Sequence, residues 1–196
     1  MLKKEAREIT GGLSKPSKMP GPAYNLPAYK CITGAKLAKI PGSVCAGCYA
    51  LKGRYRFSNV RDALDRRLAS LSHPQWVDAM VTLIGKQPYF RWHDSGDLQS
   101  AWHLKQIFEV CVRTPGTRHW LPTREVKFLK LLDPEAVPGN LTIRISSHMI
   151  DQPPVKFWPW TSTVGSSGGT CPAPQNGNKC GPCRACWDRK VQNIQY

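Results

Sequence analysis

Seven of the eight cysteines in this 196-residue chain form two clusters, one toward each end of the sequence. The first cluster comprises Cys31, Cys45 and Cys48. The second cluster comprises Cys171, Cys180, Cys183 and Cys186. Two thiolates separated by two residues at a tight turn can point at one centre, and such pairs are the common element of zinc and iron–sulfur sites. We therefore expect the chain to fold around a metal centre.

The spacing of the C-terminal cluster favours iron–sulfur over zinc. Cys180, Cys183 and Cys186 recur at intervals of three residues, and the intervening Gly181-Pro182 permits a tight turn. Bacterial ferredoxins use this spacing to bind three corners of a 4Fe–4S cluster, whereas zinc usually takes two well-separated pairs. Cys171 would complete a closed four-thiolate site. A zinc staple without reactivity is the alternative.

The N-terminal cluster offers only three thiols. A four-iron cluster held by three thiolates leaves one iron open to a substrate or cofactor, as catalytic zinc keeps one position open. Alternatively, Cys45 and Cys48 join two C-terminal thiols in a single site. The sequence thus allows one cluster or two. Cys111, on the apolar stripe of a predicted helix, is expected to be a core residue.

Composition indicates a globular cytoplasmic protein. The hydrophobic content is 41%, which is normal for a folded soluble chain. The first eight residues are charged and precede no apolar stretch, so they do not form a signal peptide, and no segment is long enough to span a membrane. In the reducing cytoplasm, clustered cysteines indicate metal binding rather than disulfides.

The net charge of +15 is unevenly distributed. Residues 1–67 hold 14 Lys and Arg against 4 Asp and Glu, and residues 68–196 hold 14 against 9. A basic half of this size suits DNA, RNA or another anionic ligand. Charge balance for anionic thiolate clusters explains it equally well.

The chain is expected to form a single domain, with an irregular basic arm (1–57), a βα core (58–165) and a cysteine-rich C-terminal segment (166–196). Hydrophobic patterning predicts strands at 88–93, 118–121, 141–145 and 161–164. It predicts helices from Ser58, as the capping residue, and at 74–86, 99–113 and 125–132. This alternation predicts an α/β fold with a parallel sheet. The specific expectation is a partial or open TIM-like βα barrel, with the two cysteine-rich segments forming a metal site.

Polar residues follow three of these strands in succession. The predicted cofactor-binding residues are His93, Asp94, Asp97, Arg124 and His148. Parallel βα folds place functional side chains at the carboxyl ends of strands, so these residues are expected to converge. The alternative is a structural role, with helix capping by Asp97 and a local turn.

Four motifs resemble the phage gene-eighty-eight protein family. They are GGLSKPSKMP at 11–20, PGSVCAGCYALKG at 41–53, HDSGD at 93–97 and CGPCRACW at 180–187. The resemblance implies a phage protein with an iron–sulfur cluster, acting in the cytoplasm of the infected bacterium.

The Cys45-x-x-Cys48-Tyr49-Ala50 element and the HDSGD motif are also similar to phage proteins related to radical S-adenosylmethionine barrels. That similarity implies S-adenosylmethionine as a cofactor, with Asp94 and Asp97 holding its amino group. The usual C-x-x-x-C-x-x-C signature is absent, because Cys31 lies thirteen residues before Cys45.

The sequence thus supports three alternative functions. The favoured one is a 4Fe–4S protein that binds nucleic acid or another anionic ligand. The others are a radical S-adenosylmethionine-like enzyme and a zinc-stapled nucleic-acid-binding module.

Overall fold

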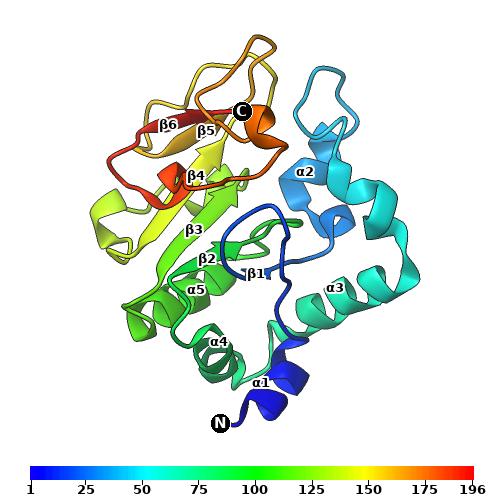
Figure 1. Cartoon of the computed structure of the whole chain (residues 1–196), viewed down its shortest axis with the longest axis vertical. Coiled ribbons are helices and arrows are strands. Elements are labelled where there is room, and N and C mark those ends of the chain that lie inside the picture. Colours follow the sequence, from blue (N-terminus) through cyan, green and yellow to red (C-terminus); the bar gives the residue numbers. More distant parts are fainter.

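The chain folds around one parallel β-sheet. The computed structural model describes all residues from Met1 to Tyr196. Its six strands are β1 (Ala23–Tyr24), β2 (Tyr89–Trp92), β3 (Arg118–Thr123), β4 (Leu141–Ser146), β5 (Thr161–Thr163) and β6 (Asn193–Gln195). They pair in sequence order, and every pairing is parallel (Figure 1). The α/β class and the parallel sheet are confirmed, but the sheet does not close, so the structure does not establish a barrel.

The α-helices are α1 (Lys3–Thr10), α2 (Ile32–Leu37), α3 (Ser58–Ser70), α4 (Trp76–Ile84) and α5 (Ala101–Arg113). The predicted helices of the βα core correspond to α3, α4 and α5. In Figure 1, α1, α4 and α5 lie below the sheet, whereas α2 lies toward the upper right. None of the helices combines the length and the apolar character needed to cross a bilayer.

Two helix predictions were wrong in detail. Ser58 is the first residue of α3 rather than its cap, because Phe57 occupies the capping position and no side chain caps the helix. The helix predicted at 125–132 is only a 3₁₀ turn at Val126–Phe128.

The N-terminal arm is more ordered than predicted. It contains α1, α2 and the strand β1, whose Ala23 pairs with Arg91 and Tyr24 with Trp92 of β2. The last strand, β6, was also missed. Strands of two and three residues are too short to show the alternation of apolar and polar residues that indicates a strand.

Tyr24 joins the sheet to the helices beneath it. Its side chain is fully buried, and its hydroxyl lies 2.8 Å from the carbonyl oxygen of Thr10 and 3.0 Å from that of Arg67. The indole Nε1 of Trp76 donates to the same hydroxyl at 3.2 Å. Tyr24 therefore connects α1, α3 and α4 through one buried oxygen, and burial raises its pKa to about 12.

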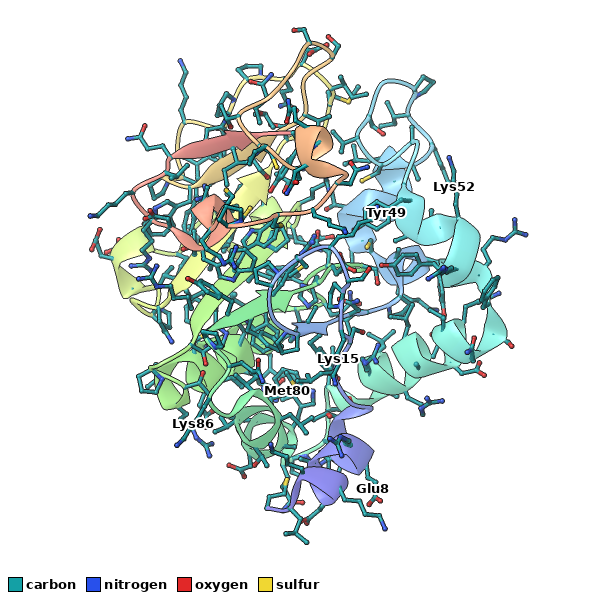
Figure 2. All side chains as sticks on the ribbon, viewed as in Figure 1. Glu8, Lys15, Tyr49, Lys52, Met80 and Lys86 are labelled. Atoms are coloured by element: carbon teal, nitrogen blue, oxygen red, sulfur yellow. The ribbon has the colours of Figure 1, made fainter.

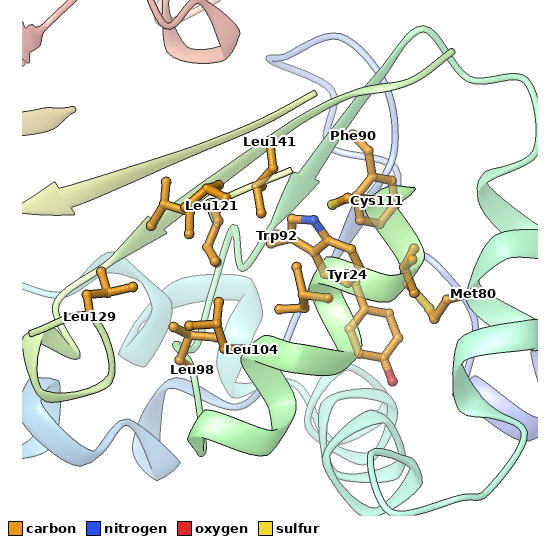
Figure 3. Packing of buried hydrophobic residues seen from close by; sticks show 14 of the residues in the cluster. Tyr24, Met80, Phe90, Trp92, Leu98, Leu104, Cys111, Leu121, Leu129 and Leu141 are labelled. Carbon is orange, nitrogen blue, oxygen red and sulfur yellow. The ribbon is translucent and has the colours of Figure 1, made fainter. Parts of the chain in front are cut away.

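The apolar core contains 22 buried residues on the sheet and the helices that cover it. Figure 3 shows Tyr24, Trp92 and Met80 packed within it. Cys111 is also fully buried in this cluster, so its predicted role as a core residue is confirmed.

Buried histidines should make the fold sensitive to acid. Burial lowers the pKa of both His103 and His119 to about 3. In the unfolded chain these rings bind a proton near pH 6.5, whereas in the folded protein they stay neutral down to about pH 3. Their contribution to the free energy of unfolding is therefore complete above the unfolded pKa and is lost as the pH falls toward 3. We expect each ring to reduce the free energy of unfolding by about 1.4 kcal/mol between about pH 7.5 and about pH 5.5.

Urea unfolding of the wild type and of His103→Asn at about pH 7.5 and about pH 5.5 measures this effect. The variant should lose less stability on acidification, by about 1.4 kcal/mol. An equal loss in both proteins would contradict the assignment. The difference between the two proteins is the informative quantity, because Asp97 titrates in the opposite direction.

Candidate functional site

A pocket of about 600 Å³ lies at the carboxyl ends of the strands. Residues that follow β1, β2 and β3, together with Ser146 of β4, Ser162 of β5 and Tyr196 after β6, line it. Seven of the residues predicted from the sequence line the pocket together: Cys31, Cys45, Cys48, His93, Asp94, Asp97 and Arg124. The structure therefore brings the N-terminal cysteines and the strand-end polar residues to one place.

The other predicted residues do not line this pocket. His148 lies beside it, with its Nε2 atom 3.3 Å from the carbonyl oxygen of Arg124. The C-terminal cysteines also lie outside its lining. No group of three or more Cys, His, Asp or Glu side chains meets closely enough to hold a single metal ion.

A buried carboxylate fixes the segment that carries the thiols. Glu125 is fully buried after β3, and its two oxygens accept hydrogen bonds from the Thr33 amide at 2.7 Å and the Thr33 hydroxyl at 2.8 Å. Thr33 lies in the first turn of α2, directly after Cys31 and Ile32. Sequence analysis missed this pair, because a contact between residues 33 and 125 leaves no local signal.

Gly34 packs closely against two of the cysteines. A methyl group at this position would lie 3.0 Å from Cβ of Cys31 and 3.7 Å from the sulfurs of both Cys31 and Cys45. Gly34 itself lines the pocket. A larger residue would therefore crowd Cys31 and lie against both sulfurs. Cys48 is held near them by a turn in which its amide donates to the Cys45 carbonyl at 3.1 Å.

Burial disfavours free thiolates at this site. It raises the pKa of Cys31, and the negative charges of Asp97 and of Cys48 and Cys45 raise it further. Burial also raises the pKa of Cys45, although Arg124 partly opposes this effect. Both thiols are therefore held in the protonated form, and only a bound positive charge would offset the cost of ionising them there.

Asp94 anchors the cysteine segment to β2. Its carboxylate forms an ion pair with Arg91 at 3.0 Å and accepts a hydrogen bond from Tyr55 at 3.0 Å. The hydroxyl of Tyr49, which directly follows Cys48, donates to the Asp94 carbonyl. The backbone amide of Asp94 in turn donates to the Asn25 side chain at 2.8 Å.

Asp97 joins the loop after β2 to the end of β3. One carboxylate oxygen accepts from the Leu98 amide at 2.8 Å and the Thr123 hydroxyl at 2.5 Å, and the other accepts from the Arg124 amide at 2.9 Å. Burial nevertheless raises its pKa to about 6. Asp97 does not cap α5, because Ser100 does so by accepting from the His103 amide at 3.0 Å.

His93 holds a conformation that usually requires glycine. Its φ angle is 59°, and both ring nitrogens are buried without hydrogen-bond partners. Burial lowers its pKa well below 6.5, so the ring is neutral. Backbone strain combined with unpaired polar atoms is typical of a functional position. Nearby, Gly96 has φ 81°, and a Cβ there would lie 2.6 Å from Leu26.

Arg124 presents free hydrogen-bond donors at the pocket. Its side chain makes one hydrogen bond, from Nε to the Ser147 carbonyl at 3.4 Å, which leaves the terminal nitrogens for a ligand. Arg91 is more constrained, since it pairs with Asp94 and stacks 4.4 Å from the Trp120 ring. Sequence analysis missed Arg91, Ser162 and Tyr196, although each lies in or next to a strand.

These features define an α/β protein with an open parallel sheet and a thiol-lined pocket at its strand ends. The sequence matches the family model for gene product 88 over residues 1–157. The chain therefore belongs to the gene product 88 family, and the resemblance to this phage family is confirmed. No curated protein and no solved structure matches the chain.

Replacing Asp97 by asparagine should weaken the loop that borders the pocket. Asparagine has one acceptor oxygen where Asp97 uses two, so the amide of either Leu98 or Arg124 loses its partner in Asp97→Asn. In the matched variant Glu125→Gln, the glutamine oxygen accepts from the Thr33 amide and its NH₂ group donates to the Thr33 hydroxyl. Both variants remove one buried charge.

We expect Asp97→Asn to be less stable than Glu125→Gln by about 1–3 kcal/mol, the penalty for an unpaired buried N–H group. Chemical denaturation of both variants at about pH 7.5 measures the difference. Equal free energies of unfolding would show that the Asp97 hydrogen bonds do not hold the loop.

Proposed function

We propose that this protein is an iron–sulfur protein in which Cys31, Cys45 and Cys48 hold a 4Fe–4S cluster at the strand-end pocket. The observation that carries the proposal is that these three thiols line one pocket with the polar residues that follow the parallel strands. In such a cluster each thiolate binds a different iron. Three thiolates therefore leave one iron facing the pocket.

The sulfur arrangement supports a cluster more than zinc. A zinc ion with bonds of about 2.3 Å draws its thiolate sulfurs to within about 4 Å of one another. The N-terminal thiols share a pocket without meeting at one point. Separate sulfurs around a common space suit a group that contains several irons. When bound, the cluster would supply electron transfer or a Lewis-acidic iron.

The charges in the pocket favour an anionic ligand. Arg124 offers free N–H groups that can bind a phosphate or carboxylate. The neutral His93 ring can donate to a ligand from one nitrogen and accept at the other. Asp94 and Asp97 have several partners within the chain, which supports a positioning role for both carboxylates.

S-adenosylmethionine is the second candidate ligand. The observation that favours it is that the three thiols and the HDSGD motif line the same pocket. Its cationic amino group, however, would have to bind carboxylates that already have partners.

The segment that contains the N-terminal cysteines suits a polyanion. Residues 9–61 contain nine Lys and Arg and no Asp or Glu. Two aromatic side chains of this segment, Tyr49 and Phe57, are 57% and 59% exposed. Figure 2 shows Lys52 and Tyr49 together on the upper right of the molecule, away from Lys86. Exposed aromatic rings among basic residues bind single-stranded nucleic acid by stacking and phosphate contacts, which supports DNA or RNA as the anionic ligand.

Adding a methyl group at Gly34 should displace the cluster. The new methyl of Gly34→Ala would lie against the sulfurs of Cys31 and Cys45. Gly47→Ala is the matched control, because a methyl there has no neighbour within 4 Å. After anaerobic purification, we expect Gly47→Ala to keep the wild-type iron and sulfide content and Gly34→Ala to lose about four of each per chain. Equal contents in the two folded variants would contradict the assigned site.

Nucleic-acid binding should depend on the position of the charges rather than on their number. In the test variant Lys52, Arg54 and Arg56 are replaced by Glu. In the control variant Lys86, Lys105 and Lys130, which are also exposed, are replaced by Glu. We expect only the test variant to lose affinity for short fluorescent single-stranded DNA and RNA, with a salt slope reduced by about 0.7 for each lost phosphate contact. Equal affinity of the two variants would argue against this surface.

A further inference from the structure

We propose that a second pocket, which adjoins the strand-end pocket, binds the phosphate group of a nucleotide, either free or within a nucleic-acid strand. Arg67, Lys15 and Arg54 would hold the phosphate. This site goes beyond the ligand site proposed above, and its lining contains no cysteine. The proposal therefore stands whether or not the N-terminal thiols hold a cluster.

The second pocket has a volume of about 370 Å³ and lies between α3 and the arm that precedes β1. Its lining residues come from this arm, from the end of β1, from the 3₁₀ turn Gly53–Arg56, from α3 and from the loop after β2. Figure 2 shows Lys15 on the arm, on the side toward α3. Asp94 lines both pockets, so the two are neighbours.

Arg67 is a buried cation that uses only part of its hydrogen-bonding capacity. It lines the second pocket, yet the residue is only 8% exposed. Its Nε atom donates to the Gly12 carbonyl at 2.8 Å, whereas its terminal nitrogens have no acceptor in the chain and no acidic side chain pairs with it. A buried guanidinium is costly without an anionic partner. Two adjacent terminal nitrogens form the fork that binds phosphate oxygens.

The turn at Gly11 and Gly12 holds the Arg67 side chain in place. Both glycines are in the left-handed region, with φ angles of 73° and 77°. A Cβ on Gly11 would lie 3.0 Å from Cγ of Arg67, so the turn packs directly on the aliphatic part of the side chain. The hydrogen bond to the Gly12 carbonyl then orients the guanidinium. Arg67 is thus positioned before a ligand binds, which lowers the entropic cost of binding.

Two further cations and one amide complete the donor set. Lys15 and Arg54 line the pocket and are exposed, and their side chains form no hydrogen bond or ion pair within the chain. Asn25 is buried, and its Oδ1 atom accepts from the Asp94 amide at 2.8 Å, which leaves the NH₂ group as a donor. Asp94 is the only acidic residue of the lining, and its ion pair with Arg91 offsets its charge. The pocket therefore has an excess of positive charge.

These features fit a phosphate ester better than a carboxylate. A carboxylate has two oxygens, which one guanidinium can satisfy, whereas the oxygens of a phosphate accept from donors that approach from several directions. Val60, Ala63 and Leu64 also line the pocket from one face of α3 and offer apolar surface to a sugar or base. The volume lies within the range of sites for small organic ligands, so the pocket can hold a nucleotide unit as well as its phosphate.

The test compares two pairs of substitutions in the full chain. Lys15→Ala with Arg54→Ala removes two cations of the second pocket. Lys4→Ala with Arg66→Ala is the matched control, because both residues are exposed and line neither pocket. The probes are inorganic phosphate, a deoxynucleoside 5′-monophosphate, a short single-stranded oligonucleotide and succinate. Binding is followed by NMR titration of the backbone and arginine Nε–H signals of isotope-labelled protein.

We expect the pocket pair to bind the phosphate probes about tenfold more weakly than the control pair, or weaker still, because two charged donors are lost. Arg67→Lys should also weaken binding, since lysine keeps the charge but lacks the planar fork. Binding of the monophosphate would identify a free nucleotide as the ligand, and binding of the oligonucleotide alone would identify a backbone phosphate. Either result supports the proposal.

Three results would overturn the proposal: equal affinities of the two pairs for every phosphate probe, no binding of any phosphate probe, or equally tight binding of succinate. Failure of the proposed function has other signatures. Loss of the cluster assignment appears in the metal content, which this titration does not use. Failure of nucleic-acid binding appears as a protein that binds the monophosphate but not the oligonucleotide.

Discussion

The hydrogen bonds of buried carboxylates at the strand ends are the constraint on which the candidate site depends. Glu125 binds Thr33 through both oxygens, and Asp97 binds donors from its own loop and from β3. Carboxylates can be buried at low cost only when donors surround them, so each one fixes the segments that provide those donors. Asp94 adds a third link, through Arg91 and Tyr55. Glu125 and Asp94 thus hold the cysteine segment over the sheet, whereas Asp97 holds the loop after β2 against the end of β3.

Arginines provide the complementary charge. Arg124 lowers the pKa of Cys45 against the effect of burial, and Arg144 does the same for Cys186. Two of the arginines therefore lie near partly buried thiols. The acid-free stretch of residues 9–61 remains as the surface that suits an external polyanion.

The sequence predicted most of the sheet and half of the site because those parts have local signals. The strands β2 to β5 and the helices α3 to α5 carry clear apolar patterns, and the HDSGD motif directly follows a strand. By contrast, β1 and β6 are too short to show a pattern. Glu125 and Thr33 are 92 residues apart. The spacing of apolar residues along the chain does not predict a contact between such distant positions. His148 follows a strand as predicted, yet it lies beside the pocket rather than in its lining.

The central claim is that three N-terminal thiols hold a cluster with one open iron. Anomalous diffraction at the iron edge, from crystals grown anaerobically, tests it most directly. The account predicts four irons in the pocket, three bound to Cys31, Cys45 and Cys48 and the fourth without a cysteine ligand. A pocket without iron, or a cysteine from the C-terminal segment on the fourth iron, would contradict it.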